Sequence, residues 1–408
     1  MNLQVSTFPD HSFIRKLIVL MAIMSMIWQF ASDNYLPSFS AIAQSFKTTP
    51  QYLSLSVSIF FLSIGSIQIL YGILSDSYGR KNILIVGYLI FIIGCFVCAL
   101  ASSITIFFIG RLIQGCGIGA NVALYRSILR DKFSGAKLSQ VSSLISTFIA
   151  LIPPIAPIIG GYIQTYFGWR DNFYFVIALS IIIIVFFIIY CPETHPLTKR
   201  QPFRFHIVLT NLKLVITDRL FMVYVVCAGL STACSLISVL VSPYLFESLL
   251  HIPPEKFGWI LSCITVSILV GGILNIKLTH HYKLCTLILL GSGLMLLSGL
   301  FFILLSYLQW TNAFSILFLI FLISIGARIN SANIFACAVG SFDMSVGLAS
   351  AIFGSCQFII SAIVSGLSSE IVSLSALGEI FIFIPLIIIF LVFVVNNNFI
   401  VRSYIRKN

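Results

Sequence analysis

The stretch that decides the fold reads Gly72-Ile73-Leu74-Ser75-Asp76-Ser77-Tyr78-Gly79-Arg80-Lys81, a short polar segment between two apolar runs. The runs cover 52–74 and 82–102, and each is long enough to cross a hydrocarbon core of about 30 Å. Glycines permit a sharp turn and close helix contact, whereas the basic pair suits the cytoplasmic headgroups. The stretch therefore predicts a pair of membrane helices joined by a tight cytoplasmic turn.

Outward from this turn, apolar runs continue along most of the chain. The 408 residues are 59% hydrophobic and 9% charged, whereas a soluble domain carries about 25% charged residues. Uninterrupted apolarity favours helices, which satisfy their own backbone in lipid. We predict an all-α membrane protein with 12 transmembrane helices. The predicted spans cover 14–37, 52–74, 82–102, 104–129, 139–164, 171–190, 217–243, 254–278, 284–308, 312–336, 343–369 and 376–396.

The basic residues between these spans set the orientation. A net charge of +11 is compatible with nucleic-acid binding, but the lysines and arginines gather on one side of the predicted membrane, as the positive-inside rule requires. The opposite side receives only Lys47, Arg170 and Lys256. We therefore expect a multi-pass protein of a bacterial inner membrane with both termini in the cytoplasm, and no nucleic-acid partner.

The longest connection divides the spans into six and six. We predict an N-terminal bundle over 1–191, a cytoplasmic linker over 192–216 and a C-terminal bundle with a short tail over 217–408. The tripeptide at 72–74 recurs at 272–274, at equivalent corners of the two halves. Two parallel halves favour a substrate site between them near the midplane. A phosphate-binding Gly-x-x-x-x-Gly-Lys-Ser/Thr string does not occur, so we expect an ion gradient to drive any pumping.

Two of these segments resemble motifs of the major facilitator superfamily. The segment 72–81 resembles its cytoplasmic signature loop, and Arg111-Leu112-Ile113-Gln114-Gly115-Cys116-Gly117 is similar to its second motif. The resemblance implies two pseudo-symmetric six-helix bundles. It also implies a cytoplasmic lock between them, formed by Gly72, Asp76, Gly79, Arg80 and Lys81, in which Asp76 faces a helix N-terminus. Arg111 lies inside a span, so it needs a partner or water unless it snorkels to the outer end of its helix.

The fifth span carries a segment rich in proline and glycine. Residues 150–161 resemble the antiporter motif of the superfamily, although Ile152 or Pro153 replaces the glycine expected before the first proline. This resemblance implies export, while a bend without any effect on direction is the alternative. The residues predicted to bend the helix and to allow close contact are Pro153, Pro154, Pro157, Gly160 and Gly161.

Asp33-Asn34-Tyr35-Leu36-Pro37, at the outer end of the first span, looks like the signature of the Bcr/CflA drug-resistance branch. The segments 125–131 and 342–357 agree with that branch. An intramembrane carboxyl group marks a functional site, because it can take a proton from one side and release it to the other. We predict that Asp33 couples transport to protons and that Arg111 influences it. The alternative is that Asp33 only caps the helix or lies among the outer headgroups.

Polar and aromatic side chains inside the spans are the candidates for a substrate cavity. Arg328 favours an anionic, zwitterionic or neutral polar substrate, although a polar cluster can equally hold helices together. The predicted lining residues are Tyr35, Asn121, Tyr125, Arg328, Asn330, Asn333 and Gln357, and the aromatic candidates are Trp28, Phe353 and Phe358.

These patterns favour a proton-coupled secondary transporter that exports drug-like or small metabolite molecules by alternating access. The alternatives are an importer or a metabolite or siderophore exporter on the same fold; a non-transporting receptor or a membrane-embedded enzyme has less support. The expected partners are a small-molecule substrate, protons and the bilayer, and we expect a monomer. The ten cysteines show no metal-ligand spacing, so no metal or cofactor is predicted beyond the proton gradient.

Overall fold

The computed structural model describes residues 11–133, 135–200, 216–310, 312–340, 346–369 and 374–405, which form helices and connecting turns without a strand among them. The first half contains α1 (His11–Asp33), η1 (Leu36–Ser38), α2 (Phe39–Ser45), α3 (Pro50–Tyr78), α4 (Arg80–Ala99), α5 (Ile104–Lys132), α6 (Gly135–Tyr166), α7 (Trp169–Tyr190) and η2 (Leu197–Lys199). The second half contains α9 (Arg219–Pro243), the π-helix η3 (Tyr244–Leu249), α10 (Pro254–Thr279), α11 (Leu284–Leu308), α12 (Ala313–Gly340), α13 (Val346–Leu367) and α14 (Leu374–Ile405).

The helix starts follow from local capping chemistry. The side chains of Thr49, Ser103 and Asp218 accept hydrogen bonds from the backbone N–H groups three residues later, at 3.2, 3.3 and 2.7 Å. Each of these bonds satisfies one of the N–H groups that the first turn of a helix leaves free. Polar residues between apolar runs therefore fix where α3, α5 and α9 begin.

The membrane-spanning helices agree with the prediction of an all-α protein. Ten helices in the described part of the chain are long and apolar enough to span a bilayer, and α1 and α14 occupy the first and last predicted spans. The first span is shorter than predicted, because α1 ends at Asp33 and Pro37 lies in η1. Pro37 lacks an N–H group and restricts the residue before it, so the α-helix stops. The sequence reasoning also missed η1 and α2.

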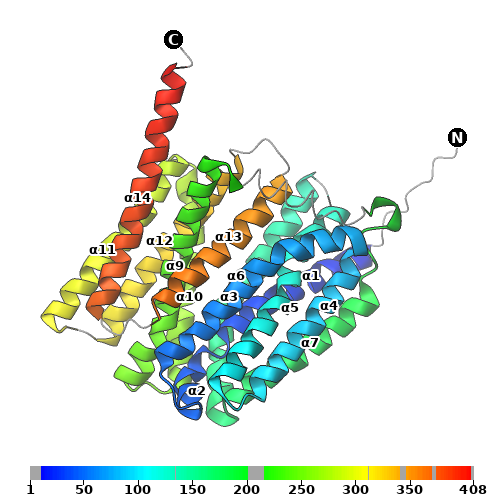
Figure 1. Cartoon of the computed structure of the whole chain (residues 1–408), viewed down its shortest axis with the longest axis horizontal. Coiled ribbons are helices and arrows are strands. Elements are labelled where there is room, and N and C mark those ends of the chain that lie inside the picture. Colours follow the sequence, from blue (N-terminus) through cyan, green and yellow to red (C-terminus); the bar gives the residue numbers. More distant parts are fainter. Residues whose placement is uncertain are drawn as a thin grey trace.

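The helices pack as two groups whose most extensive contacts with each other are made by two pairs of helices. In the first group α5 packs on α3 and α4, and α1 packs on α6 and α7; in the second α11 packs on α12 and α14, and α9 on α12 and α13. Figure 1 shows the first group in blue to green, up to α7, and the second from the green α9 to the red α14. The pairs α3–α13 and α6–α10 join them. The exact bundle and linker limits stay a prediction, since 201–215 lie outside the described residues.

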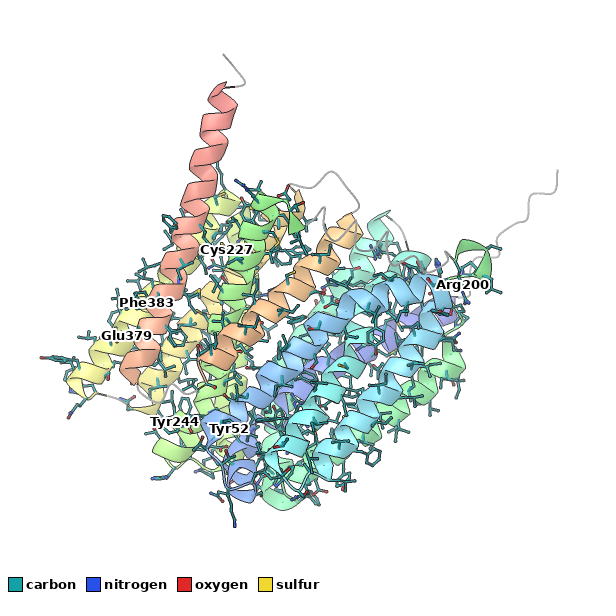
Figure 2. The ribbon with its side chains drawn as sticks, in the orientation of Figure 1. Tyr52, Arg200, Cys227, Tyr244, Glu379 and Phe383 are labelled. Atoms are coloured by element: carbon teal, nitrogen blue, oxygen red, sulfur yellow. The ribbon has the colours of Figure 1, made fainter. Side chains whose placement is uncertain are left out.

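The two ends of the helices differ. The end that carries α2, termed the α2 side, lies opposite the end where α1 begins and α14 finishes (Figure 1). Tyr52 and Tyr244 lie at the α2 side, whereas Arg200 lies at the other end, termed the Gly79 side (Figure 2). The predicted signature loop is thus at the Gly79 side, and Asp33 is at the α2 side.

Candidate functional site

Asp33 is a buried carboxyl group at the last residue of α1. Its side chain is 7% exposed, and Gln29 Nε2 donates a hydrogen bond of 2.7 Å to Asp33 Oδ2. None of the ion pairs in the described part of the chain includes Asp33. A helix C-terminus presents the negative end of the dipole, so an N-cap role is excluded there. The burial places the side chain against protein atoms, and its depth relative to the outer headgroups stays a prediction.

Arg111 is fully buried and joins three helices of the first group. Its guanidinium lies over the rings of Phe60 and Tyr35, at 4.1 and 4.6 Å from their centroids. Nη1 donates to the Ala31 carbonyl of α1 at 3.3 Å and to Gln114 Oε1, while Nη2 has no hydrogen-bond partner. Arg111 therefore does not snorkel. It reaches α1 two residues before Asp33.

Two residues predicted to line the cavity lie instead inside the first group of helices. Tyr35 is fully buried, its hydroxyl bonds Ser56 Oγ at 3.0 Å, and its ring packs on Phe173 at 5.6 Å. Asn121 is 1% exposed and donates to the Met24 carbonyl at 2.5 Å. The lining role does not fit either placement, because helix-to-helix contacts cover both side chains.

Tyr125 and Gln357 lie nearer the surface of their bundles. Tyr125 is 9% exposed and accepts a hydrogen bond from Arg126 Nε at 2.7 Å. Gln357, half-buried on α13, donates to Thr232 Oγ1 of α9 at 2.7 Å. Both are engaged within their own group of helices.

The polar residues of α12 separate into buried and exposed groups. Asn330 donates to Ser292 Oγ of α11 at 2.9 Å, and Asn333 donates to Asn275 Oδ1 of α10 at 2.6 Å. These two buried asparagines hold helices together, which was the alternative to a lining role. Arg328 is exposed at mid-length of α12, beside Gly271 and Gly272 of α10, whose missing side chains leave it room.

The proline-glycine segment of α6 forms a contact between the two groups of helices. The helix runs continuously through Pro153, Pro154 and Pro157, and its bend stays a prediction. A Cβ on Gly160 would collide with the Asn34 carbonyl just after α1, and one on Gly161 would lie 2.8 Å from the Pro254 carbonyl of α10. Gly160 thus allows close packing within the first bundle, and Gly161 allows close packing between the two bundles.

Several contacts near this segment close the α2 side. The 3-10 helix η1 packs on α6, α9 and α10, and α2 packs on η3. Farther in, Ser58 Oγ of α3 and Ser365 Oγ of α13 are hydrogen-bonded at 2.9 Å, and the rings of Phe61 and Phe358 meet at 5.5 Å. We term the contact of η1, α2 and Gly161 with η3 and the first turn of α10 the α2-side gate.

The signature loop at the Gly79 side forms a network within the first group of helices. Arg80 pairs with Asp76 Oδ1 at 2.8 Å and with Asp131 Oδ2 at 3.1 Å. Lys81 Nζ donates to the Ile188 carbonyl at 2.7 Å. The bonds of Arg80 and Lys81 in the described residues thus stay within the first half. Gly72 has open space, with no atom within 4 Å of an added Cβ.

Glu193 lies at the N-terminus of α4, the kind of position that the sequence analysis predicted for Asp76. Its carboxylate accepts the backbone N–H groups of Arg80 and Lys81 at 3.0 and 3.2 Å, at the positive start of α4. Arg200 Nη2 lies 3.6 Å from Glu193 Oε2. Gly79 has φ +97°, and a side chain there would strike both Glu193 and Arg200. The N–H groups at the start of α4 thus bond Glu193, whereas Asp76 pairs with the side chain of Arg80.

Comparison with known families agrees with this geometry. Residues 19–366 match the Major Facilitator Superfamily. The chain belongs to the major facilitator superfamily. It is 30% identical, over 90% of each chain, to a bicyclomycin resistance protein homolog of Haemophilus influenzae. It is 26% identical to the multidrug resistance protein MdtL of Citrobacter koseri, over 81% of this chain and 83% of the relative. These relatives support the Bcr/CflA branch.

Solved structures of the superfamily share the fold. The D-xylose-proton symporter superposes with a TM-score of 0.72 at 16% identity, covering 92% of this chain and 97% of that one. A variant of the nucleoside transporter NupG gives 0.73 at 15% identity, covering 94% and 98%. The two-bundle facilitator fold and a role as a multi-pass membrane transporter, not an enzyme, follow from the family.

Sequence reasoning missed three residues of this facilitator. Glu193 follows α7 outside the recognised motifs, and Asn172 of α7 donates to Ser38 Oγ of η1 at 3.0 Å. Glu247 is 8% exposed in η3, although the hydropathy pattern marks it only as a span end. Acidic or amide residues at span ends were the available signal, but their partners lie far away in sequence.

Proposed function

We propose that this facilitator exports drug-like or small metabolite molecules in exchange for protons, by alternating access, as a monomer in a bacterial inner membrane. The names of its relatives, a bicyclomycin resistance protein homolog and a multidrug resistance protein, support export. The basic residues of the Gly79 side support a cytoplasmic position for that side and for both termini, which leaves the α2 side in the periplasm.

The observation that carries the proposal is the buried Asp33 beside the α2-side gate. A buried carboxylate without a direct ion pair is costly, so proton binding and enclosure of Asp33 favour one another. Asn34, the next residue, contacts Gly160 of α6 and donates to the Asn172 carbonyl at 3.1 Å. Asp33 is therefore adjacent in sequence to a residue that packs on α6, the helix that carries Gly161 of the gate.

Two sets of contacts at opposite ends support the proposal of alternating access. In this structure the α2 side is closed by contacts between the bundles, whereas the signature loop bonds within its own bundle. This arrangement suits a state that receives substrate from the cytoplasm. Rocking of the bundles would break the Gly161–Pro254 contact and bring the signature loop to the second bundle.

Arg328 supports a substrate with an acceptor group. An arginine facing lipid at mid-span costs about 2.5–3.5 kcal/mol on insertion scales, so an exposed Arg328 is more stable facing water between the bundles. Its guanidinium would bind a carboxylate, phosphate or carbonyl oxygen of the substrate. This position keeps export of a metabolite or siderophore as the second candidate; import remains the alternative direction.

The decisive test measures transport and proton movement together. Inverted vesicles that carry the wild-type protein should accumulate a substrate and release protons when it is added, whereas Asp33→Asn should lose uphill transport. Asp171→Asn, a half-buried acid on the same side of the first bundle, serves as the control and should keep transport. Uphill transport by Asp33→Asn would refute the role of Asp33, and proton uptake together with substrate into the cytoplasm would establish import.

A further inference from the structure

A second buried carboxyl group lies in the α2-side gate, on the other bundle. Glu247 is in the π-helix η3, which extends α9 and packs on α2 and α10. Its side chain is 8% exposed, and both carboxyl oxygens are fully buried without a hydrogen bond of ordinary geometry. Short π-helical turns within longer helices occur frequently at functional sites, because they shift side chains out of helical register.

A polar residue of the opposite bundle faces Glu247. The hydroxyl and backbone of Ser40 in α2 face the Glu247 carboxyl group, and Ser40 Oγ is itself buried without a good hydrogen bond. Closure of the gate therefore places a carboxyl group from one bundle against a hydroxyl group from the other. Opening the gate separates them and exposes both to water.

No cation compensates Glu247 in the described part of the chain. The facing element α2 and the last two turns of α9 carry no ionisable residue, and η3 itself adds only Tyr244. The first turn of α10 carries Glu255 and Lys256, but the described ion pairs do not include Glu247. Lys256 is exposed, and so is His251 in the turn between η3 and α10. A charged carboxylate would thus be buried unpaired whenever the gate is closed, which is strongly unfavourable.

We propose that Glu247 is a second proton-binding site, and that binding of a proton there favours closure of the α2-side gate. The protonated group is neutral and can donate its O–H to Ser40, whereas the carboxylate needs water and an open gate. Linkage requires that closure favours protonation by the same factor that protonation favours closure. The sign follows: acid closes the gate and base opens it, by at most tenfold in the closed-to-open ratio per pH unit for one proton.

This role differs from that of Asp33. Asp33 lies within the first bundle, bonded to Gln29 of its own helix, and serves the proposed exchange of substrate for a proton. Glu247 lies between the bundles, and its burial depends on the gate. The inference does not require export or any particular substrate.

The test is a distance measurement across the gate at varied pH. Spin labels replace Lys47 after α2 and Lys256 in α10, which are exposed on opposite sides of the gate. In nanodiscs without substrate, the ratio of long to short distances in Asp33→Asn protein should rise between pH 5.5 and 8.5, by up to tenfold per pH unit. Adding Glu247→Gln should keep the gate closed over the whole range.

Two further variants make the result decisive. Glu255→Gln, on the first turn of α10, should keep the pH-dependent opening. Glu247→Leu, which removes the hydrogen bond but stays neutral, should abolish the pH dependence as Glu247→Gln does, so a folding defect in one variant does not decide the outcome. A pH-dependent opening that persists in both Glu247 variants would refute the proposal. The role of Asp33 is tested separately by the transport assay. Failure of the Glu247 proposal therefore leaves the proton-coupling role of Asp33 testable, and the reverse also holds.

Discussion

Replacement of Gly161 by alanine should open the α2-side gate. The added Cβ would lie 2.8 Å from the Pro254 carbonyl of α10, whereas ordinary van der Waals contact begins at 3.4 Å. The atom belongs to a backbone and cannot rotate away, so the bundles must separate. Overpacking of this kind costs about 1–3 kcal/mol.

The effect falls on one state of the protein only. Alanine stabilises a helix by about 1 kcal/mol relative to glycine, but this gain is the same with the gate open or closed and cancels. The overpacking cost applies only while α6 touches α10. The closed-to-open ratio should therefore fall by about 5- to 150-fold.

Distances between labels at positions 47 and 256 measure this ratio. Gly160→Ala is the matched control, because its Cβ would meet Asn34 of the same bundle in both states. It should lower the melting temperature without changing the distance distribution. Gly72→Ala, with open space, should change neither. A wild-type distribution in Gly161→Ala would refute the reasoning, as would a gate shift in Gly160→Ala.

Arg111→Lys should lower the melting temperature, at a cost of about 1.5–3 kcal/mol, because lysine cannot reproduce the bonds to Ala31 and Gln114 while covering two rings; unchanged thermal unfolding would contradict this. Glu193→Gln should destabilise the protein by about 0.3–2 kcal/mol, measured by thermal unfolding, since the start of α4 loses its negative partner. Cys191, just beyond α7, should resist maleimide at pH 7, because it is 1% exposed and burial raises the pKa of its thiol to about 11. Glu193→Ala should accelerate this labelling, and an equal rate in both proteins would show that Glu193 does not hold the segment closed.

The sequence was sufficient to predict which segments of the chain span the membrane. Long apolar runs are governed by bilayer thickness, which acts on each segment independently. The end of α1 at Asp33 was harder to predict. Pro37 indicates that the helix stops, but it does not indicate that η1 and α2 follow. A short helix that packs on the other bundle depends on partners more than 100 residues away, such as Asn172 for Ser38.

The sequence identified the charged residues of the candidate site, but it did not predict which residues contact them. Asp33 and Arg111 were identifiable because a charge inside an apolar span is expensive. Tyr35 and Asn121 were assigned to a cavity because polarity in a span is compatible with either water or another helix. Only the packing separates these cases, and both residues contact neighbouring helices. Glu193 and Glu247 lie at span ends, where acidic residues are common. Their roles become visible only from the structure, because it shows the residues that surround them.

The attachment of Glu193 and Arg200 to the start of α4 shortens the mechanical tether between the bundles. The segment 192–200 is anchored to the first bundle by these bonds, so it cannot extend when the bundles rock. Nine residues of extended chain correspond to about 30 Å of reach. Release of this segment, for example by Glu193→Ala, would therefore add that reach to the connection between the bundles.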